Sequence, residues 1–233
     1  MKENQNYKNE GLAALKGNWA QAVLAMLVCV LIICACEMAS IGWLMKNGGG
    51  VPAAGDMQAV QSYLGGAFFR MTLTYLLIFL VVGPLLVGLV NALKELVFSG
   101  DGKIVSNSFK IGYGNYWRHV WGFLLRGIFI FLWSLLLIVP GIIKSLSYAM
   151  TFYILRDRPE LSVNQAINLS KDMMYGHKFD LFYLYLSFIG WILLCILTLG
   201  IGILWVYPYI EAAQASFYAD VKADYEARQG AAS

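Results

Sequence analysis

Long apolar runs constrain this chain more than any other feature of its sequence. The longest, from Leu181 to Ile210, has 30 residues and no charge, and the run from Met71 to Leu93 has 23. A third run of 25 residues, from Ala20 to Leu44, carries Glu37 as its only charge. About 20 apolar residues in a helix cross the hydrocarbon core of a bilayer. The runs therefore predict an all-α, polytopic transmembrane helical bundle, in which the helices satisfy their own backbone hydrogen bonds.

The composition argues against other classes of protein. Charged residues make up 13% of the chain, against about 25% in soluble domains. The net charge of +3 includes no dense block of Lys and Arg, so we expect no nucleic-acid partner. The four cysteines lie in apolar runs and the two histidines, His119 and His177, lie far apart, so we expect no metal and no other cofactor. Gly48–Gly50 lacks the context of a phosphate-binding loop and no serine sits in a nucleophile elbow, so we expect no enzymatic activity.

Turn-forming residues divide the longer runs and predict six spans in a single transmembrane domain, residues 1–233. The run Ala20–Leu44 is longer than the apolar core of a signal peptide, so we expect it to be retained as the first span. Ser99–Arg118 is expected to be a connecting loop, and Asn47–Gly66 a Gly-rich external insert. The breaks are expected at Pro84, Pro140, Gly141, Gly200 and Gly202, and the spans are Ala20–Leu44, Met71–Leu93, His119–Val139, Ile142–Leu155, Leu181–Leu197 and Ile203 to about Tyr218.

The distribution of basic residues favours six spans over four. With six spans and both termini in the cytoplasm, 13 of the 17 Lys and Arg residues lie inside, three lie outside or near it, and Arg126 lies in the membrane. A four-span alternative, in which the turns at Pro140 and Gly200 are only kinks, would leave nine inside and seven outside. Cytoplasmic loops carry the excess of positive charge, so the six-span arrangement in a bacterial plasma membrane is the better fit.

Three similar segments suggest an internal repeat. Gly followed by polar and aromatic residues precedes three apolar runs, at Gly17, Gly114 and Gly176. The repeat units would be residues 12–101, 104–157 and 161–220, each a helical hairpin led by an amphipathic segment. The clearest such segment, Leu161–Tyr175, begins with a capping box of Ser162 and Gln165 and is expected to lie in the inner headgroup plane. Its apolar face comprises Val163, Ala166, Ile167, Met173 and Met174.

Several short motifs resemble a known family. They are Ala14–Trp19, Pro140–Lys144 with Tyr148, Phe152–Asp157, Ala166–Ser170 and Tyr175–Lys178. In these motifs the chain resembles the bacterial integral membrane proteins catalogued as domain of unknown function 975. It is more distantly similar to the membrane region of some glycerophosphodiester phosphodiesterases. The resemblance implies a multi-pass plasma-membrane protein, and it brings no catalytic residues.

Two ionisable residues lie deep within expected spans. Arg126 is eight residues past Arg118, and Glu211 is eight residues into the sixth span. Charges in lipid are costly, so each of these residues is a candidate for a function. We expect Arg126 and Glu211 to face the bundle interior as a pair, with a structural ion pair or a snorkelling arginine as the alternative.

Two functions remain open at this point. The first is a non-enzymatic envelope protein, lipid-associated or a scaffold, which binds a partner protein or forms a homo-oligomer. The second is a small transporter or exporter subunit with a polar path near Arg126 and Glu211. A continuous polar cavity would favour the second, and a fully packed interior would favour the first.

Overall fold

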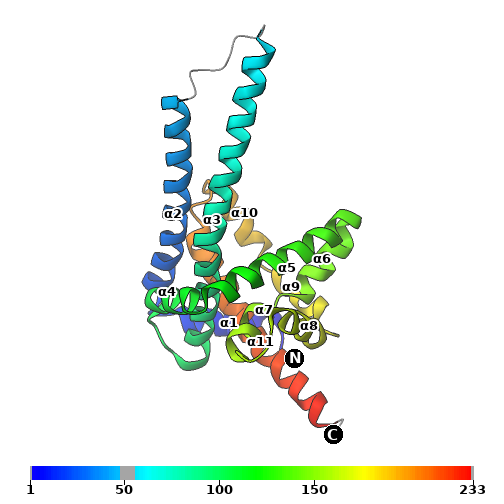
Figure 1. Cartoon of the computed structure of the whole chain (residues 1–233). Helices are drawn as coiled ribbons and strands as arrows, with labels where there is room; N and C mark the ends of the chain where they lie inside the picture. The colour runs from blue at the N-terminus through cyan, green and yellow to red at the C-terminus, as the bar shows by residue number, and fades with distance from the viewer. Residues whose placement is uncertain (1, 48–55, 232–233) are drawn as a thin grey trace. The chain divides into compact units, whose positions relative to one another are not determined.

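The structure, a computed structural model, describes residues 2–47 and 56–231. These residues form helices joined by turns and contain no strand, which confirms the expected all-α class (Figure 1). Gly48–Gly50 lies outside the described residues. The helices are α1 (Asn4–Leu15), α2 (Trp19–Asn47), α3 (Met57–Ser99), α4 (Ile104–Gly114), α5 (Tyr116–Leu136), α6 (Ile138–Ser147), α7 (Thr151–Asp157), α8 (Val163–Met173), α9 (Lys178–Leu186), α10 (Ile189–Leu197) and α11 (Ile203–Gly230).

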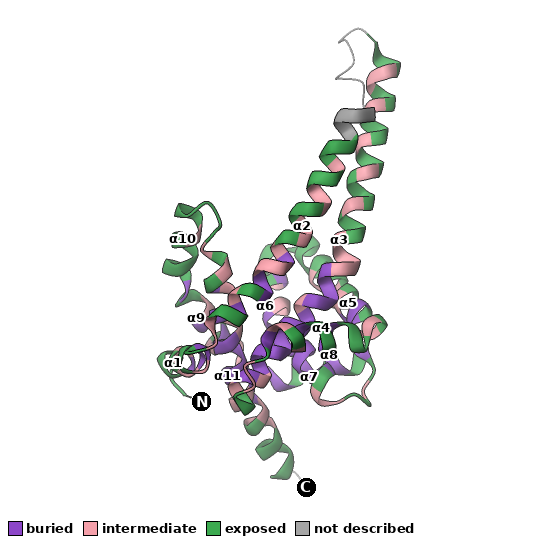
Figure 2. Cartoon of the chain, turned by 90° about the vertical axis from the view of Figure 1, so that its left-hand side faces the viewer, coloured by how far each residue is buried: buried purple, intermediate pink, exposed green. Residues whose placement is uncertain are grey.

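The chain divides into two compact units, and Leu27–Gly83 forms the smaller one. This unit contains most of α2 and the first part of α3. Its side chains are mostly exposed or half-buried (Figure 2), as expected for helices that contact lipid. Within it the Arg70 guanidinium lies 4.8 Å from the centre of the Trp43 ring, so a charge of α3 packs on an aromatic residue of α2.

The larger unit comprises residues 1–26 and 84–233 and contains the main core. Buried residues gather in the second part of α3 and in α7, α8 and α11 (Figure 2). The core is aromatic as well as aliphatic. Tyr7 packs edge-on against Phe217 at 5.4 Å, and Tyr153 stacks on Tyr218 at 4.9 Å.

Three short amphipathic helices pack closely on longer ones. In α1, a Cβ at Gly11 would lie 2.8 Å from the backbone nitrogen of Ala213 in α11. In α4, the Ser108 carbonyl oxygen occupies the place of a side chain at Gly88 in α3. In α8, the Ser170 hydroxyl hydrogen-bonds the carbonyl oxygen of Ser147 in α6 at 2.9 Å. Small residues at these three contacts therefore allow the backbones to touch.

The helix α4 corrects the expectation of a loop over Ser99–Arg118. Ile104, Ser108, Ile111 and Gly112 are buried, and their spacing of four, three and one residues marks one face of a helix. Only two short stretches of this segment are not helical: residues 100–103, in which Gly100 has a φ of 71°, and Asn115 between α4 and α5. The polar residues that suggested a loop lie mainly on the other face.

The expected capping box at the start of α8 is confirmed. The Ser162 hydroxyl accepts from the Gln165 N–H at 3.3 Å, and the Gln165 side chain accepts from the Ser162 N–H at 2.8 Å. The expected apolar face is also confirmed, but it is buried inside the protein. It packs towards α5, α6 and α7, so this face is not free to insert into headgroups as expected.

The chain reverses direction near both Pro140 and Gly200, the two turns that separate the six-span from the four-span arrangement. The first reversal is not at the expected residue. Leu137 is extended and separates α5 from α6, so Pro140 and Gly141 lie in the first turn of α6 and not in the reversal. Proline is well tolerated there, because its missing N–H would have no partner in the helix. At Gly141 a Cβ would lie 2.9 Å from the Ser134 Cα, so the glycine allows α6 to fold back closely on α5.

The second reversal lies at Leu199–Gly200, within the predicted break. These residues have φ values of 51° and 89°, and the Gly200 N–H donates to the Cys195 carbonyl at 2.8 Å. A residue with positive φ and such a bond is typical of a helix C-terminus. Gly202 follows and precedes α11.

The expected break at Pro84 is wrong, and so is part of the expected insert Asn47–Gly66. The helix α3 continues through Pro84 without a break. It also begins at Met57, so the last ten residues of the expected insert, 57–66, are helical. Asp56 explains that start, because its carboxylate accepts from the Ala59 N–H at 2.9 Å.

Among residues 2–47 and 56–231, five helical stretches are long and apolar enough to cross a membrane. They are Trp19–Trp43, Met57–Ser99, Tyr116–Leu136, Ile138–Asp157 and Lys178–Leu197. They correspond to the first five expected spans. The sixth, Ile203 to Tyr218, lies in α11, which is not among the five, so the count of six stays a prediction.

Candidate functional site: a polar cavity at Arg126 and Glu211

Arg126 and Glu211 line one cavity in the larger unit. Its volume is about 210 Å³. Arg126 comes from α5 and Glu211 from α11, and both side chains are half-buried. The other lining residues are apolar ones from α3, α5 and α7, Ala149, and three polar ones: Tyr185, Tyr207 and Gln214. The structure thus brings the two charges that the sequence singled out, Arg126 and Glu211, to one place.

The Arg126 guanidinium has few direct partners. Its central carbon lies 4.9 Å from the centre of the Phe152 ring, and its Nε is buried without a hydrogen bond. Among the described residues it forms no ion pair with Glu211 or any other acid. Glu211 is still near enough to interact with it electrostatically. The positive charge therefore faces the cavity beside the Phe152 ring, without a carboxylate partner in the described part of the chain.

Glu211 is held by tyrosine hydroxyls. The Tyr153 hydroxyl donates to the Glu211 Oε2 at 3.4 Å, and Tyr207 also hydrogen-bonds the carboxylate. Tyr207 lies one turn before Glu211 on α11, so a local contact along the helix positions the acid.

Gln214 completes the polar wall. Its side-chain oxygen accepts from the Tyr185 hydroxyl at 2.7 Å, and its amide nitrogen lies 3.5 Å from the Ala149 carbonyl. These bonds join α11 to α9 and to the turn between α6 and α7.

Sequence reasoning missed the three polar residues that accompany the charged pair. Tyr207, Glu211 and Gln214 follow at i, i+4 and i+7 on α11, so they share one helix face. A polar stripe of that spacing in an apolar run is a signal that the sequence does contain. No comparable signal exists for Tyr185, which reaches the cavity from another helix.

The expected breaks do not contribute to this cavity. None of Pro84, Pro140, Gly141, Gly200 and Gly202 lines it, and Gly202 lines a separate apolar groove. The breaks therefore shape the helices, and the polar site depends on side chains of α5, α9 and α11.

A second polar cluster forms around Asp157, next to the stacked rings of Tyr153 and Tyr218. The Tyr218 hydroxyl donates to Asp157 at 2.9 Å, and Asp157 also pairs with Lys94 and, at 3.1 Å, with Lys222. Tyr153 contacts Glu211 through its hydroxyl and Tyr218 through its ring. Polar groups thus extend from the cavity to the charged ends of α3, α7 and α11.

The site contains several groups that can bind a polar solute. It offers a guanidinium, a carboxylate, phenols and an amide, which are donors and acceptors for a polar solute. Within the described part of the chain, no three His, Cys, Asp or Glu residues lie together as metal ligands would. The histidines make separate contacts: His119 Nδ1 lies 2.8 Å from the Gly112 carbonyl, and His177 Nε2 lies 2.9 Å from Asp224.

Comparison with known proteins identifies the family. Residues 72–225 match the family described as "Protein of unknown function (DUF975)". Searches of curated proteins and of solved structures gave no match. The more distant resemblance to the membrane region of glycerophosphodiester phosphodiesterases is not tested by the family match and stays a prediction. The match covers well over half of the sequence, so the chain belongs to the DUF975 family.

Proposed function

We propose that this protein is a non-enzymatic, multi-pass protein of the bacterial cytoplasmic membrane that binds and moves a small polar solute. The observation that carries the proposal is the shared cavity, in which Arg126 and Glu211 face the same space and, among the ion pairs of the described residues, form none with each other. A structural ion pair would bring the two side chains into contact. A polar cavity between helices is also what distinguishes a transport component from a packed scaffold.

The solute is small and carries a negative group. Arg126 presents the planar fork of donors that binds carboxylate or phosphate, and Glu211 accepts from an ammonium group. The cavity volume of about 210 Å³ lies below the roughly 300–1,000 Å³ of drug-sized sites. A compact anion or zwitterion fits both the charges and the volume.

The proposed topology has six spans, with both termini in the cytoplasm. Residues 203–218 of α11 form the sixth span, and the chain reversal at Leu199–Gly200 supports it. The excess of Lys and Arg on the side of the termini sets the orientation. In this arrangement Glu211 lies within the bilayer, at the depth of Arg126.

We also propose that the three hairpins are repeats arranged cyclically. Each amphipathic helix packs on the returning helix of the preceding hairpin: α4 on α3, α8 on α6 and α7, and α1 on α11. The contact residues support this, because each precedes the glycine of its motif by six positions: Gly11 and Gly17, Ser108 and Gly114, Ser170 and Gly176.

Cysteine accessibility tests the proposed function. Ala149 lines the cavity, and an Ala149→Cys variant can be made after Cys29, Cys34, Cys36 and Cys195 are replaced by alanine. We expect charged, membrane-impermeant methanethiosulfonates to modify the introduced thiol from either side of the membrane in oriented vesicles. The anionic reagent should react about tenfold faster than the cationic one, because Arg126 attracts it.

Variants of the two charged residues and a buried control test whether the labelling rates report on the cavity. Arg126→Gln should lower the ratio of anionic to cationic rates, and Glu211→Gln should raise it. Ala166→Cys is the control, because Ala166 is fully buried in α8 and does not line the cavity. If the thiol of Ala149→Cys were modified as slowly as that of Ala166→Cys, the cavity would not be accessible and the proposed binding site would be rejected. If reagent modified Ala149→Cys from one side of the membrane only, transport would be rejected.

The other function, a lipid-associated component, is favoured by a different observation. Two apolar grooves of the larger unit lie outside the polar cavity and are lined by exposed aliphatic and aromatic side chains. A transport component can also bind lipid, so the two functions are compatible.

A further inference from the structure

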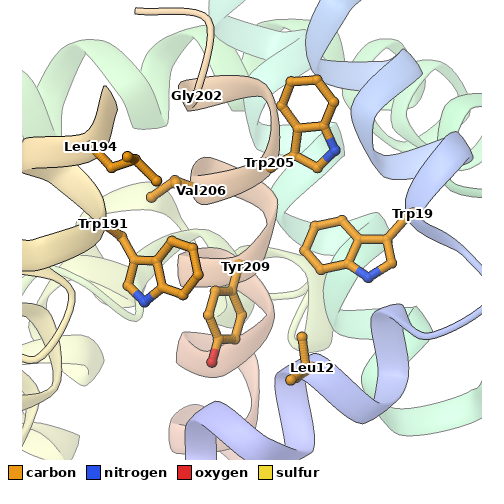
Figure 3. A pocket seen from close by; sticks show the side chains of 8 residues that line it. All are labelled: Leu12, Trp19, Trp191, Leu194, Gly202, Trp205, Val206 and Tyr209. Atoms are coloured by element: carbon orange, nitrogen blue, oxygen red, sulfur yellow. The ribbon is translucent and has the colours of Figure 1, made fainter. Parts of the chain in front are cut away.

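Two grooves of the larger unit repeat one geometry. The first lies between α6 and α9 and has a volume of about 500 Å³. The second has about 410 Å³ and lies along α11 (Figure 3). Figure 3 shows Trp191 and Trp19 facing this second groove from opposite sides of α11, with Gly202 towards one end and Leu12 towards the other. Both volumes are in the range of sites for drug-sized ligands.

The same register of a returning helix lines each groove. Four residues contribute to each groove, from α6 in the first and from α11 with its N-cap residue in the second, and their spacings are identical at three, one and three residues. They are Val139, Ile142, Ile143 and Leu146 in the first groove, and Gly202, Trp205, Val206 and Tyr209 in the second.

One residue of the opposite wall also corresponds. Lys178 in the first groove and Trp19 in the second each lie two residues after a glycine with positive φ, which is 88° at Gly176 and 87° at Gly17. The same local turn therefore places one side chain at the rim of each groove. A groove that the fold builds twice from matched positions is a feature of the architecture, in contrast to a chance gap between side chains.

The first groove has an unmatched positive charge at its rim. Lys178 is half-buried and, in the part of the chain that the structure describes, makes no hydrogen bond and no ion pair. Lys144 lies within electrostatic range of both Lys178 and Lys171. The nearest acid in sequence, Asp180, pairs with His177 at 3.5 Å. Lys178 therefore adds a positive charge to an otherwise apolar groove, and Lys144, whose ammonium lies 4.3 Å from the centre of the Trp133 ring, is within electrostatic range of it.

The second groove has a weaker form of the same arrangement. The Lys8 ammonium lies 4.8 Å from the centre of the Phe188 ring and donates to the Ser187 carbonyl at 3.2 Å. Phe188 in turn packs edge-on against Tyr209, which lines the groove, at 5.0 Å. This lysine already has partners, so the first groove is the better site for an anion.

We infer that the groove between α6 and α9 binds one anionic phospholipid. An acyl chain lies against Val139, Ile142, Ile143 and Phe182, and the phosphate group lies at Lys178. Charge complementarity selects an anionic headgroup, because each lysine near such a surface contributes favourably. This inference does not depend on the polar cavity, which other residues line.

Lipid retention by the intact protein tests the inference. The full chain is purified in mild detergent, incubated with dioleoylphosphatidylglycerol or dioleoylphosphatidylcholine, and examined by native mass spectrometry. We expect the wild type to retain one phosphatidylglycerol more tightly than phosphatidylcholine. Lys178→Gln should weaken retention of phosphatidylglycerol about fivefold and leave that of phosphatidylcholine unchanged.

Two controls match the charge and the size of the changes. Lys110→Gln removes the same charge from the exposed face of α4 and should leave retention unchanged. Ile143→Trp fills the groove and should lower retention of both lipids, whereas Ile128→Trp, at an exposed position of α5, should not. Lys178→Arg keeps the charge and should keep the preference, which separates loss of binding from loss of fold.

Several outcomes would overturn the inference. Equal retention of the two lipids by the wild type would reject an anionic site. Equal effects of Lys178→Gln and Lys110→Gln would reject the position of the headgroup. Unchanged retention in Ile143→Trp would reject the groove as the place of the acyl chain. Displacement of the lipid by inorganic phosphate alone would show that the site binds free phosphate and not phospholipid.

Discussion

The Ser170 hydroxyl bridges the break between α6 and α7 by donating to the Ser147 carbonyl at 2.9 Å. The same oxygen accepts from the Met150 N–H at 3.2 Å. The helical hydrogen bonds are interrupted there, so both backbone groups would otherwise be buried without partners. One side chain of α8 thus satisfies a donor and an acceptor of the helix pair on which it packs.

Ser170→Ala should therefore destabilise the protein by about 2 kcal/mol, because it leaves two buried backbone groups unsatisfied. Thermal unfolding in detergent, followed by the fraction that remains monodisperse, measures the change. Ser106→Ala, at an exposed position of α4, is the control and should have no effect. Equal stability of the two variants would contradict the bridging role.

Substitution by alanine should have opposite effects on stability at Gly11 and at Gly127. Gly11→Ala should cost about 1–3 kcal/mol, because the added methyl group would lie 2.8 Å from the Ala213 nitrogen and push α1 away from α11. Gly127 in α5 has nothing within 4 Å of an added Cβ, so Gly127→Ala should be neutral or stabilise by up to about 1 kcal/mol. Unfolding of both variants under identical conditions compares them.

Local signals in the sequence were read correctly where the responsible groups are close together in the chain. The capping box needs only Ser162 and Gln165, three residues apart, and both of its hydrogen bonds form. The reversal at Leu199–Gly200 depends on two neighbouring residues with positive φ, one of them a glycine. The apolar runs needed only length and composition to predict helices.

The errors come from tertiary contacts. Pro140 is a strong turn signal, but the chain turns three residues earlier, where Leu137 can be extended and α6 can still pack on Ser134. The polar residues of α4 suggested a loop. Ser108 and Gly112 are small and buried because the backbone of α4 lies against that of α3 at these two residues, which the sequence of α4 alone does not show. In the cavity, Tyr185 reaches Gln214 from a helix 29 positions away, which no spacing rule anticipates.

The contact between His177 and Asp224 predicts a dependence of stability on pH. The hydrogen bond from His177 holds the pKa of the Asp224 carboxyl below its usual value, with the nearby Arg228 acting in the same direction. A lowered pKa in the folded state stabilises the protein above the unfolded value of about 3.9, and this stabilisation is lost as the pH falls through the folded-state value.

Asp224→Asn should therefore reduce the fall in melting temperature between about pH 5 and pH 3, because the variant has no carboxyl to protonate. A series of thermal melts in detergent across this interval measures the slope. Asp172→Asn, at an exposed position of α8, is the matched control. The assignment fails if the two variants change the slope equally.

Two ion pairs of α3 should differ sharply in strength. Lys94, with 8% of its side chain exposed, pairs with Asp157, whereas Glu95 pairs with Arg156 at 2.9 Å, and the Arg156 side chain is 44% exposed. Asp157→Asn leaves the Lys94 charge buried without its counter-charge and should cost about 3–5 kcal/mol. Glu95→Gln removes a solvated pair and should cost less than about 1 kcal/mol.

A third variant separates the charge from the packing. Lys94→Met combined with Asp157→Leu removes both members of the buried pair, so no uncompensated charge remains and much of the loss should be recovered. Tyr218 and Lys222 also contact Asp157, so the recovery should be incomplete. If the double variant were as unstable as Asp157→Asn, the ion pair itself would be holding α3 against α7 and α11, and the cost would not come from the unpaired charge.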